Sequence, residues 1–164
     1  MLSRFILIQT SHAGNVGGVA RAMKVMGFDD LVLVAPRWAN VLRREETIQR
    51  ASGANDVLAK ARIVDTLDEA LDGVSHLCAT AMTPRDFGPP TQAPREHFSA
   101  LLAPDQERPS GVAFLFGRGR VWVGSFIHSR RLFVFLCFFC HFELRRDFDT
   151  RLGCLLYTSP SPRD

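Results

Sequence analysis

The amino-acid sequence predicts an α/β fold with a mainly parallel sheet. Up to about residue 116, short apolar runs alternate with segments in which apolar residues recur at helical spacing. The chain has 164 residues, 46% of them hydrophobic and 23% charged, which is typical of one globular domain. Strands that alternate with helices favour parallel pairing through right-handed crossovers, and ligands then collect beyond the carboxyl ends of the strands.

The first half of the chain is expected to contain two strands and two helices. The run Phe5–Ile8 predicts a buried strand, and a second strand, Leu31–Pro36, is stopped by its proline. Between them, apolar residues from Val16 to Met26 predict a helix that Gly27 ends. A polar helix is expected within residues 43–54. The strand-to-helix turn is expected to contain three glycines, Gly14, Gly17 and Gly18.

The second half predicts three further strands and two helices. Residues 62–73 indicate a short strand and a helix that is capped near Asp65 and ends at Gly73. The side chains expected to face inward from this helix are Leu67, Ala70 and Leu71. A strand at 75–81, a loop at 83–96, a helix at about 96–102 and a strand within residues 111–120 should follow. The loops at 10–18, 80–90 and 117–120 therefore all follow strands.

The charge of the chain permits a nucleic-acid partner without arguing for one. Lysine and arginine number 20 against 17 aspartate and glutamate residues, which gives a net charge of +3. The first residues lack the long apolar region and the small-residue cleavage site of a secretory signal, so a cytoplasmic location is expected. The longest apolar run, in the tail, is too short to span a bilayer. No membrane association is expected.

The glycine-rich stretch "TSHAGNVGGVARAMKVMGF", residues 10–28, has three interpretations. It could hold a phosphate at a helix N-terminus, as dinucleotide-binding domains do, but its glycine spacing does not match G-x-G-x-x-G. The second strand also ends in Ala35, Pro36 and Arg37, without the acidic residue that would bind a ribose. It could be a turn without a ligand. The third interpretation depends on a family resemblance.

The same stretch resembles the first motif of the SPOUT superfamily of knotted RNA methyltransferases, in particular its SpoU-type, TrmJ-like tRNA ribose methyltransferases. The segments "GANDVLAKARIVDTLDEAL" and "FGRGR" continue the resemblance, which covers about residues 1–120. It implies a trefoil-knotted α/β fold, an obligate homodimer and S-adenosylmethionine as methyl donor. It also implies transfer to a ribose 2′-hydroxyl of cytidine or uridine at position 32, in the tRNA anticodon loop.

The resemblance assigns roles to six residues. Asn15 and Arg21 match the motif asparagine and the catalytic arginine. The residues that match donor-binding positions are Thr80, Ala81, Met82 and Gly117. Because an arginine keeps its proton at neutral pH, we expect Arg21 to anchor a phosphate and to stabilise the developing alkoxide, with Asn15 orienting it or the ribose. Otherwise Arg21 is a solvated helix residue, Thr80 only ends a strand and Gly117 only makes a turn.

The sequence departs from the family beyond residue 117. Gly119 and Trp122 stand where the family has glutamate and glycine, and the Ser-Leu-Asn turn of the third motif is absent. We therefore expect a methyltransferase domain at 1–120 and, at 121–164, a poorly packed phenylalanine- and cysteine-rich tail produced by a lost reading frame. On that hypothesis the knot-forming segment is missing. The alternative is a non-catalytic RNA-binding or donor-binding remnant.

The tail also contains a C-x-x-C-H motif at Cys137, Cys140 and His141. This motif attaches haem in exported proteins, and C-x-x-C forms half of many zinc sites. The chain shows no export signal and no second cysteine pair, since Cys78 and Cys154 stand alone. We therefore expect neither haem nor metal.

Overall fold

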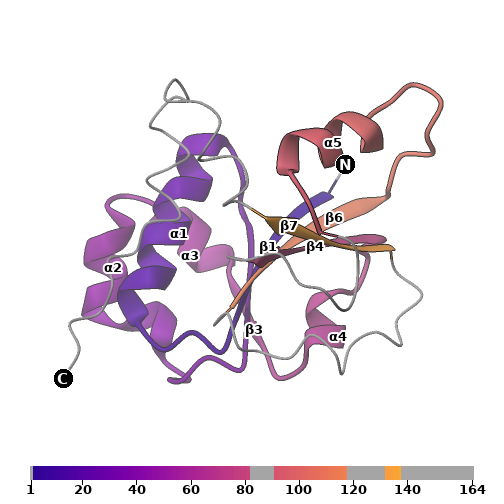
Figure 1. Ribbon diagram of the computed structural model, residues 1–164. Coiled ribbons are helices and arrows are strands. Elements are labelled where there is room, and N and C mark those ends of the chain that lie inside the picture. Colours follow the sequence, from indigo (N-terminus) through magenta and orange to yellow (C-terminus); the bar gives the residue numbers. More distant parts are fainter. Residues whose placement is uncertain (1, 82–90, 118–131, 138–164) are drawn as a thin grey trace.

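The computed structural model describes residues 2–81, 91–117 and 132–137 (Figure 1). The strands are β1 (Leu2–Ile8), β2 (Asp30–Val34), β3 (Arg62–Val64), β4 (His76–Ala81), β5 (Thr91–Gln92), β6 (Gly111–Phe116) and β7 (Leu132–Cys137). The helices are α1 (Ala13–Met26), α2 (Glu45–Ala51), α3 (Asn55–Lys60), α4 (Leu67–Ala70) and α5 (Pro94–Leu101), and a 3-10 turn, η1, spans Val41–Arg43. No helix in these ranges is long and apolar enough to cross a membrane.

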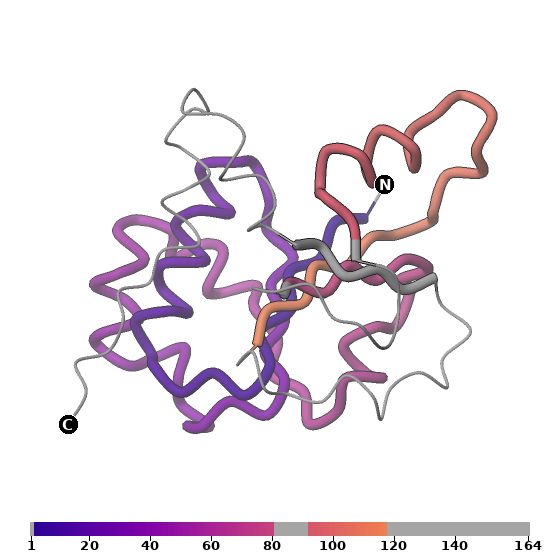
Figure 2. The backbone as a smooth tube through the Cα atoms, viewed as in Figure 1, coloured from indigo at the N-terminus to yellow at the C-terminus, as the bar shows by residue number. Residues whose placement is uncertain are grey.

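The strands form one sheet in the order β3-β2-β1-β6-β4-β7-β5, and each pairing between neighbours is parallel. Strand β1 lies inside the sheet, with Phe5 in register with Leu31 of β2 and with Phe114 of β6. The smooth trace shows how α1 leads from β1 towards one side of the sheet (Figure 2). This arrangement confirms the predicted α/β class and its parallel sheet.

Alternating side chains of β1 fill two cores. Leu7 belongs to the core beneath α1, α2 and α3, and Ile6 and Ile8 belong to the core beneath α4. Figure 1 shows α1, α2 and α3 on one side of the sheet and α4 on the other. This alternation is what the two-residue period of a strand requires when both faces are covered. A smaller cluster lies under α5, where Phe98 and Leu101 pack on β4 and β6.

The glycines of the first motif lie inside α1, which corrects the prediction of a glycine turn. Helix α1 begins at Ala13, so Gly14, Gly17 and Gly18 are all helical. A Cβ on Gly17 would overlap the Thr47 carbonyl oxygen and would lie 2.9 Å from the Ala51 nitrogen of α2. A Cβ on Gly14 would lie 2.6 Å from a Glu46 carboxylate oxygen. The Glu46 carboxylate can move aside, but the backbone of α2 cannot, so Gly17 is the glycine whose small size the packing of α2 requires.

Three further expectations change in detail. The cap of α4 is Thr66, whose Oγ1 accepts from the Glu69 backbone N–H, and not Asp65. Within the expected loop at 83–96, Thr91–Gln92 pairs with β7 as a short strand and Pro94 begins α5. The run Leu132–Cys137 of the tail pairs with β4, whereas we expected the tail to be poorly packed. Its other residues, with Met82, Cys140 and His141, lie outside the described ranges.

Candidate active site at the carboxyl edge of the sheet

The carboxyl ends of β1, β6 and β4 lie side by side in the sheet. From β1 the chain moves outward through β2 to β3, and it then crosses to the other side of β1 to form β4. In open parallel sheets, such a reversal of direction leaves a crevice at the carboxyl ends of the strands, where ligands bind. The topology therefore brings together the segments that follow these three strands, although they are far apart in the sequence.

The backbone at this edge adopts uncommon conformations. Gln9, directly after β1, has φ 50°, and Ala35, directly after β2, has φ 42°. Left-handed conformations are costly for residues other than glycine, and they cluster at functional sites. The neighbouring strands hold both residues in place, because the Gln9 N–H donates to the Val34 oxygen and the Ala35 N–H to the Val64 oxygen, both at 2.9 Å.

Helix α1 carries the two predicted catalytic residues but does not bring them together. Asn15 lies in its first turn, next to the end of β1, and its backbone N–H donates to the His12 oxygen at 3.2 Å. Arg21 is exposed and has no hydrogen bond or ion pair to any described residue. The two positions are separated by about 9 Å along the helix and about 120° around it. In one copy of the chain, they therefore face different directions.

The predicted donor-binding residues lie at the ends of β4 and β6. Thr80 donates its hydroxyl hydrogen to the Leu115 oxygen at 3.2 Å, which links the carboxyl ends of these strands. Ala81 is the last residue of β4, and Met82 is not among the described residues. Gly117 directly follows β6 and is exposed, and a Cβ there would overlap Ile8 Cγ2 at the end of β1. The missing side chain thus lets the ends of β6 and β1 meet.

Two arginines and a tryptophan form a basic and aromatic group beside this edge, which we did not predict from the sequence. The guanidinium carbons of Arg37 and Arg44 lie 4.9 Å and 4.5 Å from the centre of the Trp38 ring. The Arg37 backbone N–H donates to the Thr10 oxygen at 3.1 Å, which ties the group to the segment after β1. Arginines held on an aromatic ring present charge for phosphate and a flat surface for a base. The signal was present in "RWANVLRR", residues 37–44.

Comparisons with known proteins place this architecture in a family. Residues 3–120 match the model of the SpoU rRNA Methylase family. The tRNA (cytidine/uridine-2′-O-)-methyltransferase TrmJ of Klebsiella pneumoniae is 47% identical over 118 residues, 72% of this chain and 46% of its own length. The tRNA (cytidine/uridine/adenosine-2′-O-)-methyltransferase TrmJ of Pseudomonas aeruginosa is 45% identical over 115 residues, 70% of this chain and 43% of its own. The chain thus spans somewhat less than half the length of these curated relatives.

Solved structures confirm the fold. A probable methyltransferase from Bordetella pertussis superposes with a TM-score of 0.67 and 35% identity, covering 94% of this chain and 88% of that one. TrmJ from Z. mobilis superposes with a TM-score of 0.66 and 31% identity, covering 84% and 59%. The predicted SPOUT methyltransferase fold is therefore confirmed.

Proposed function

Because the chain belongs to the SpoU rRNA methylase family, we propose that it derives from a tRNA ribose 2′-O-methyltransferase. Its substrates would be cytidine and uridine at position 32 of the anticodon loop, and S-adenosylmethionine would be the donor. The observation that carries this proposal is the convergence of the first-motif helix, Thr80 and Gly117 at one edge of the sheet. The enzyme would act in the cytoplasm, as a homodimer, and methyl transfer would require no metal.

The residues at this edge fit a donor pocket that is lined by backbone groups. Gly117 presents no side chain where β6 meets β1, and Thr80 fixes the end of β4 against β6. We propose that Thr80, Ala81, Met82 and Gly117 hold the donor. The bound donor supplies an electrophilic methyl group. A pocket at the carboxyl ends of parallel strands is where such a ligand is expected.

Arg21 and Asn15 would act on the RNA. A ribose hydroxyl is a weak nucleophile, so transfer requires alignment and help with the departing proton. We propose that the exposed Arg21 guanidinium grips the adjoining phosphate and stabilises the alkoxide. Asn15 would orient the ribose or the arginine by hydrogen bonds. Since these two residues face different directions on α1, a second copy of the chain would complete the site in the homodimer.

The departures from the family motifs favour a second candidate function for this chain. Gly119, Trp122 and the missing Ser-Leu-Asn motif would remove one wall of the donor pocket. We propose that this chain binds the donor weakly or not at all and is a non-catalytic remnant. A chimera in which the segment after Gly117 comes from the Klebsiella pneumoniae relative should bind the donor and methylate a tRNA anticodon stem-loop. Calorimetry tests donor binding, and mass spectrometry of the RNA tests methylation. Tight donor binding by the unaltered chain would refute the proposal that it is a non-catalytic remnant.

Arg21 is tested in that chimera by single-turnover methyl transfer. Arg21→Ala should lower the rate by about 10² or more, the scale of one lost preorganised electrostatic partner. Donor affinity should hardly change, and Arg21→Lys should restore only part of the rate because lysine lacks the two-pronged grip on phosphate. A rate within about threefold of the parent would remove Arg21 from the mechanism.

A further inference from the structure

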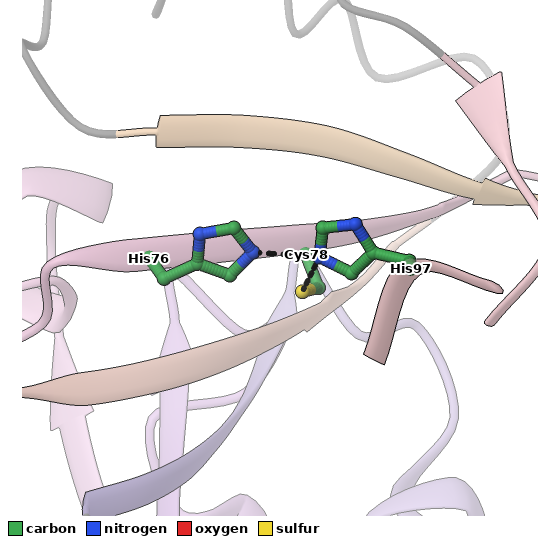
Figure 3. Close-up of side chains that lie close together, drawn as sticks. All are labelled: His76, Cys78 and His97. Atoms are coloured by element: carbon green, nitrogen blue, oxygen red, sulfur yellow. Dashed lines mark hydrogen bonds between the residues drawn. The ribbon is translucent and has the colours of Figure 1, made fainter. Parts of the chain in front are cut away.

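Two histidines and a cysteine lie together in the interior, away from the residues assigned to methyl transfer. His76 and Cys78 are two positions apart on β4, so their side chains share one face of the strand. His97, on α5, reaches the same place from the opposite side of the cluster to His76 (Figure 3). The three residues are 1%, 0% and 8% exposed, respectively. No local sequence pattern indicates this cluster, because 21 residues separate His76 from His97.

The three potential ligand atoms converge. His76 Nε2 lies 2.8 Å from His97 Nε2, and Cys78 Sγ lies 4.0 Å from His97 Nε2. All three atoms lie within 4.8 Å of one another. In a tetrahedral zinc site, bond lengths of about 2.0 Å to nitrogen and 2.3 Å to sulfur place such ligand atoms about 3.3 to 3.6 Å apart. The two imidazole nitrogens would have to move about half an ångström apart, and the sulfur would have to move closer to His76 Nε2 by up to about 1 Å, to produce that geometry.

A residue outside the cluster fixes the orientation of one imidazole. Gln92 Oε1 lies 2.8 Å from His97 Nδ1, and because an amide oxygen only accepts, His97 carries its proton on Nδ1. The Nε2 lone pair of His97 then points into the cluster. Metal-binding histidines are held in this way by an acceptor on the other ring nitrogen. Strand β5, helix α5 and strand β4 thus contribute to one arrangement.

The competing interpretation is a hydrogen-bonded histidine pair in the core. There, His76 Nε2–H donates to His97 Nε2 and the pair joins β4 to α5. That interpretation leaves the thiol with only a 4.0 Å contact to the imidazole. Burial lowers the pKa of His76 to about 4, with a further contribution from His97, and lowers that of His97, so both rings are neutral at neutral pH. Burial also raises the pKa of the Cys78 thiol to about 12, so a metal would have to displace its proton.

We propose that His76, Cys78 and His97 bind a zinc ion that fastens α5 to β4. Two imidazoles and a thiolate suit Zn²⁺, and three protein ligands leave a fourth position for water. On binding, the Cys78 thiol loses its proton to solvent as the zinc–sulfur bond forms. The His76 proton moves from Nε2 to Nδ1, so one proton is released for each ion bound. This proposal does not depend on the proposed methyl transfer.

The test is a metal titration of the full chain, reduced and stripped with a chelator. Co²⁺ should bind with one equivalent and give the absorption of a tetrahedral thiolate complex, and Zn²⁺ should displace it. Zinc should also raise the midpoint of urea unfolding, because a ligand that binds only the folded state stabilises it. Absence of binding at micromolar concentrations would overturn the proposal.

Variants distinguish zinc binding at this site from zinc binding by the cysteines of the tail. Cys78→Ala, which changes little volume, and His97→Ala should each weaken zinc binding at least tenfold, and Gln92→Ala should weaken it about tenfold through the imidazole that it orients. The double variant Cys137→Ser/Cys140→Ser is the matched control and should still bind one equivalent. If zinc is lost in this control and retained in Cys78→Ala, the site proposed here is wrong. Circular dichroism of each variant shows whether it folds, and the parent titration does not depend on them.

Discussion

Helices α1 and α5 pack on the same face of the sheet, but they are held there by different chemistry. The face is shared because Phe5 of β1, Phe114 of β6 and Cys78 of β4 are in register in parallel strands. Beneath α1 the contact is apolar, and Gly17 lets the backbone of α2 approach closely. Beneath α5, two buried histidines take the place of apolar side chains. Close packing thus makes the first contact sensitive to volume, whereas the second is sensitive to protons and metal.

The largest effect of a single substitution is expected where α2 packs against α1. Gly17→Ala places a Cβ against the Thr47 carbonyl oxygen, and a helix backbone cannot move away as a flexible side chain can. We expect the free energy of unfolding to fall by about 3 kcal/mol, the upper part of the range for overpacking. Urea unfolding followed by circular dichroism measures it.

Gly18→Ala is the matched control, one residue further along α1. Nothing lies within 4 Å of a Cβ at Gly18, which is exposed. Alanine should therefore raise stability by about 0.5 to 1 kcal/mol, its advantage over glycine in a helix. Equal effects of the two substitutions would contradict the close contact between α1 and α2.

The second contact should weaken with acid when no metal is present. Burial, and then the charge of His97, lower the pKa of His76 to about 4, against 6.5 for an ordinary histidine. Below pH 6.5, His76 binds a proton in the unfolded chain but not in the folded chain. Its contribution to the free energy of unfolding is therefore fully present above pH 6.5 and is lost as the pH falls towards 4. The loss approaches about 3 kcal/mol.

Urea unfolding between pH 7 and pH 4.5, in the presence of chelator, measures this loss. His76→Gln keeps a donor for His97 but does not titrate, so its unfolding free energy should fall less over this range. Parallel curves for the parent and His76→Gln would rule out the buried histidine as the cause.

A smaller loss of stability is expected on the other face of the sheet, where α4 is only four residues long. Its Thr66 cap accepts from the Glu69 backbone N–H at 3.3 Å and donates to the Glu69 carboxylate at 2.7 Å. Thr66→Ala should cost about 1 kcal/mol, as is usual for a lost cap. Asp65→Ala, at the position predicted from the sequence, should cost clearly less. A larger loss of stability for Asp65→Ala than for Thr66→Ala would instead identify Asp65 as the cap.

Hydrophobic patterning predicted most of the fold but less of the site. Strand β1 and helix α1 follow from their periods, because burial of one face fixes the period. The glycines were misplaced because the need for space at Gly17 comes from α2, and no local pattern records a distant helix. Similarly, His76 and His97 meet only through the topology. The pairing of β7 was not predicted, although a continuous apolar run is typical of a strand covered on both faces.

The features of the candidate site also divide into those that the sequence indicated and those that it did not. The resemblance of the first motif indicated Asn15 and Arg21, and their roles stay predictions. The left-handed backbone at Gln9 and Ala35 left no mark in the sequence, because neither residue is glycine or asparagine. The Arg37, Trp38 and Arg44 group could have been found from its composition. Its position beside the first motif depends on the hydrogen bond between Arg37 and Thr10.

The register of β1 also has a consequence during protein synthesis. Leu2 pairs with Gly111, about 110 residues later, so the ribosome completes β1 long before it supplies β6. At about 5 to 20 residues per second, β1 waits about 5 to 20 s for that partner. Until then β2 can cover only one edge, and the other exposes unpaired backbone groups on an apolar strand, a template for association with another chain. Slower translation lengthens this interval, so the yield of folded protein in a cell should depend on elongation rate and on chaperones that shield nascent strands.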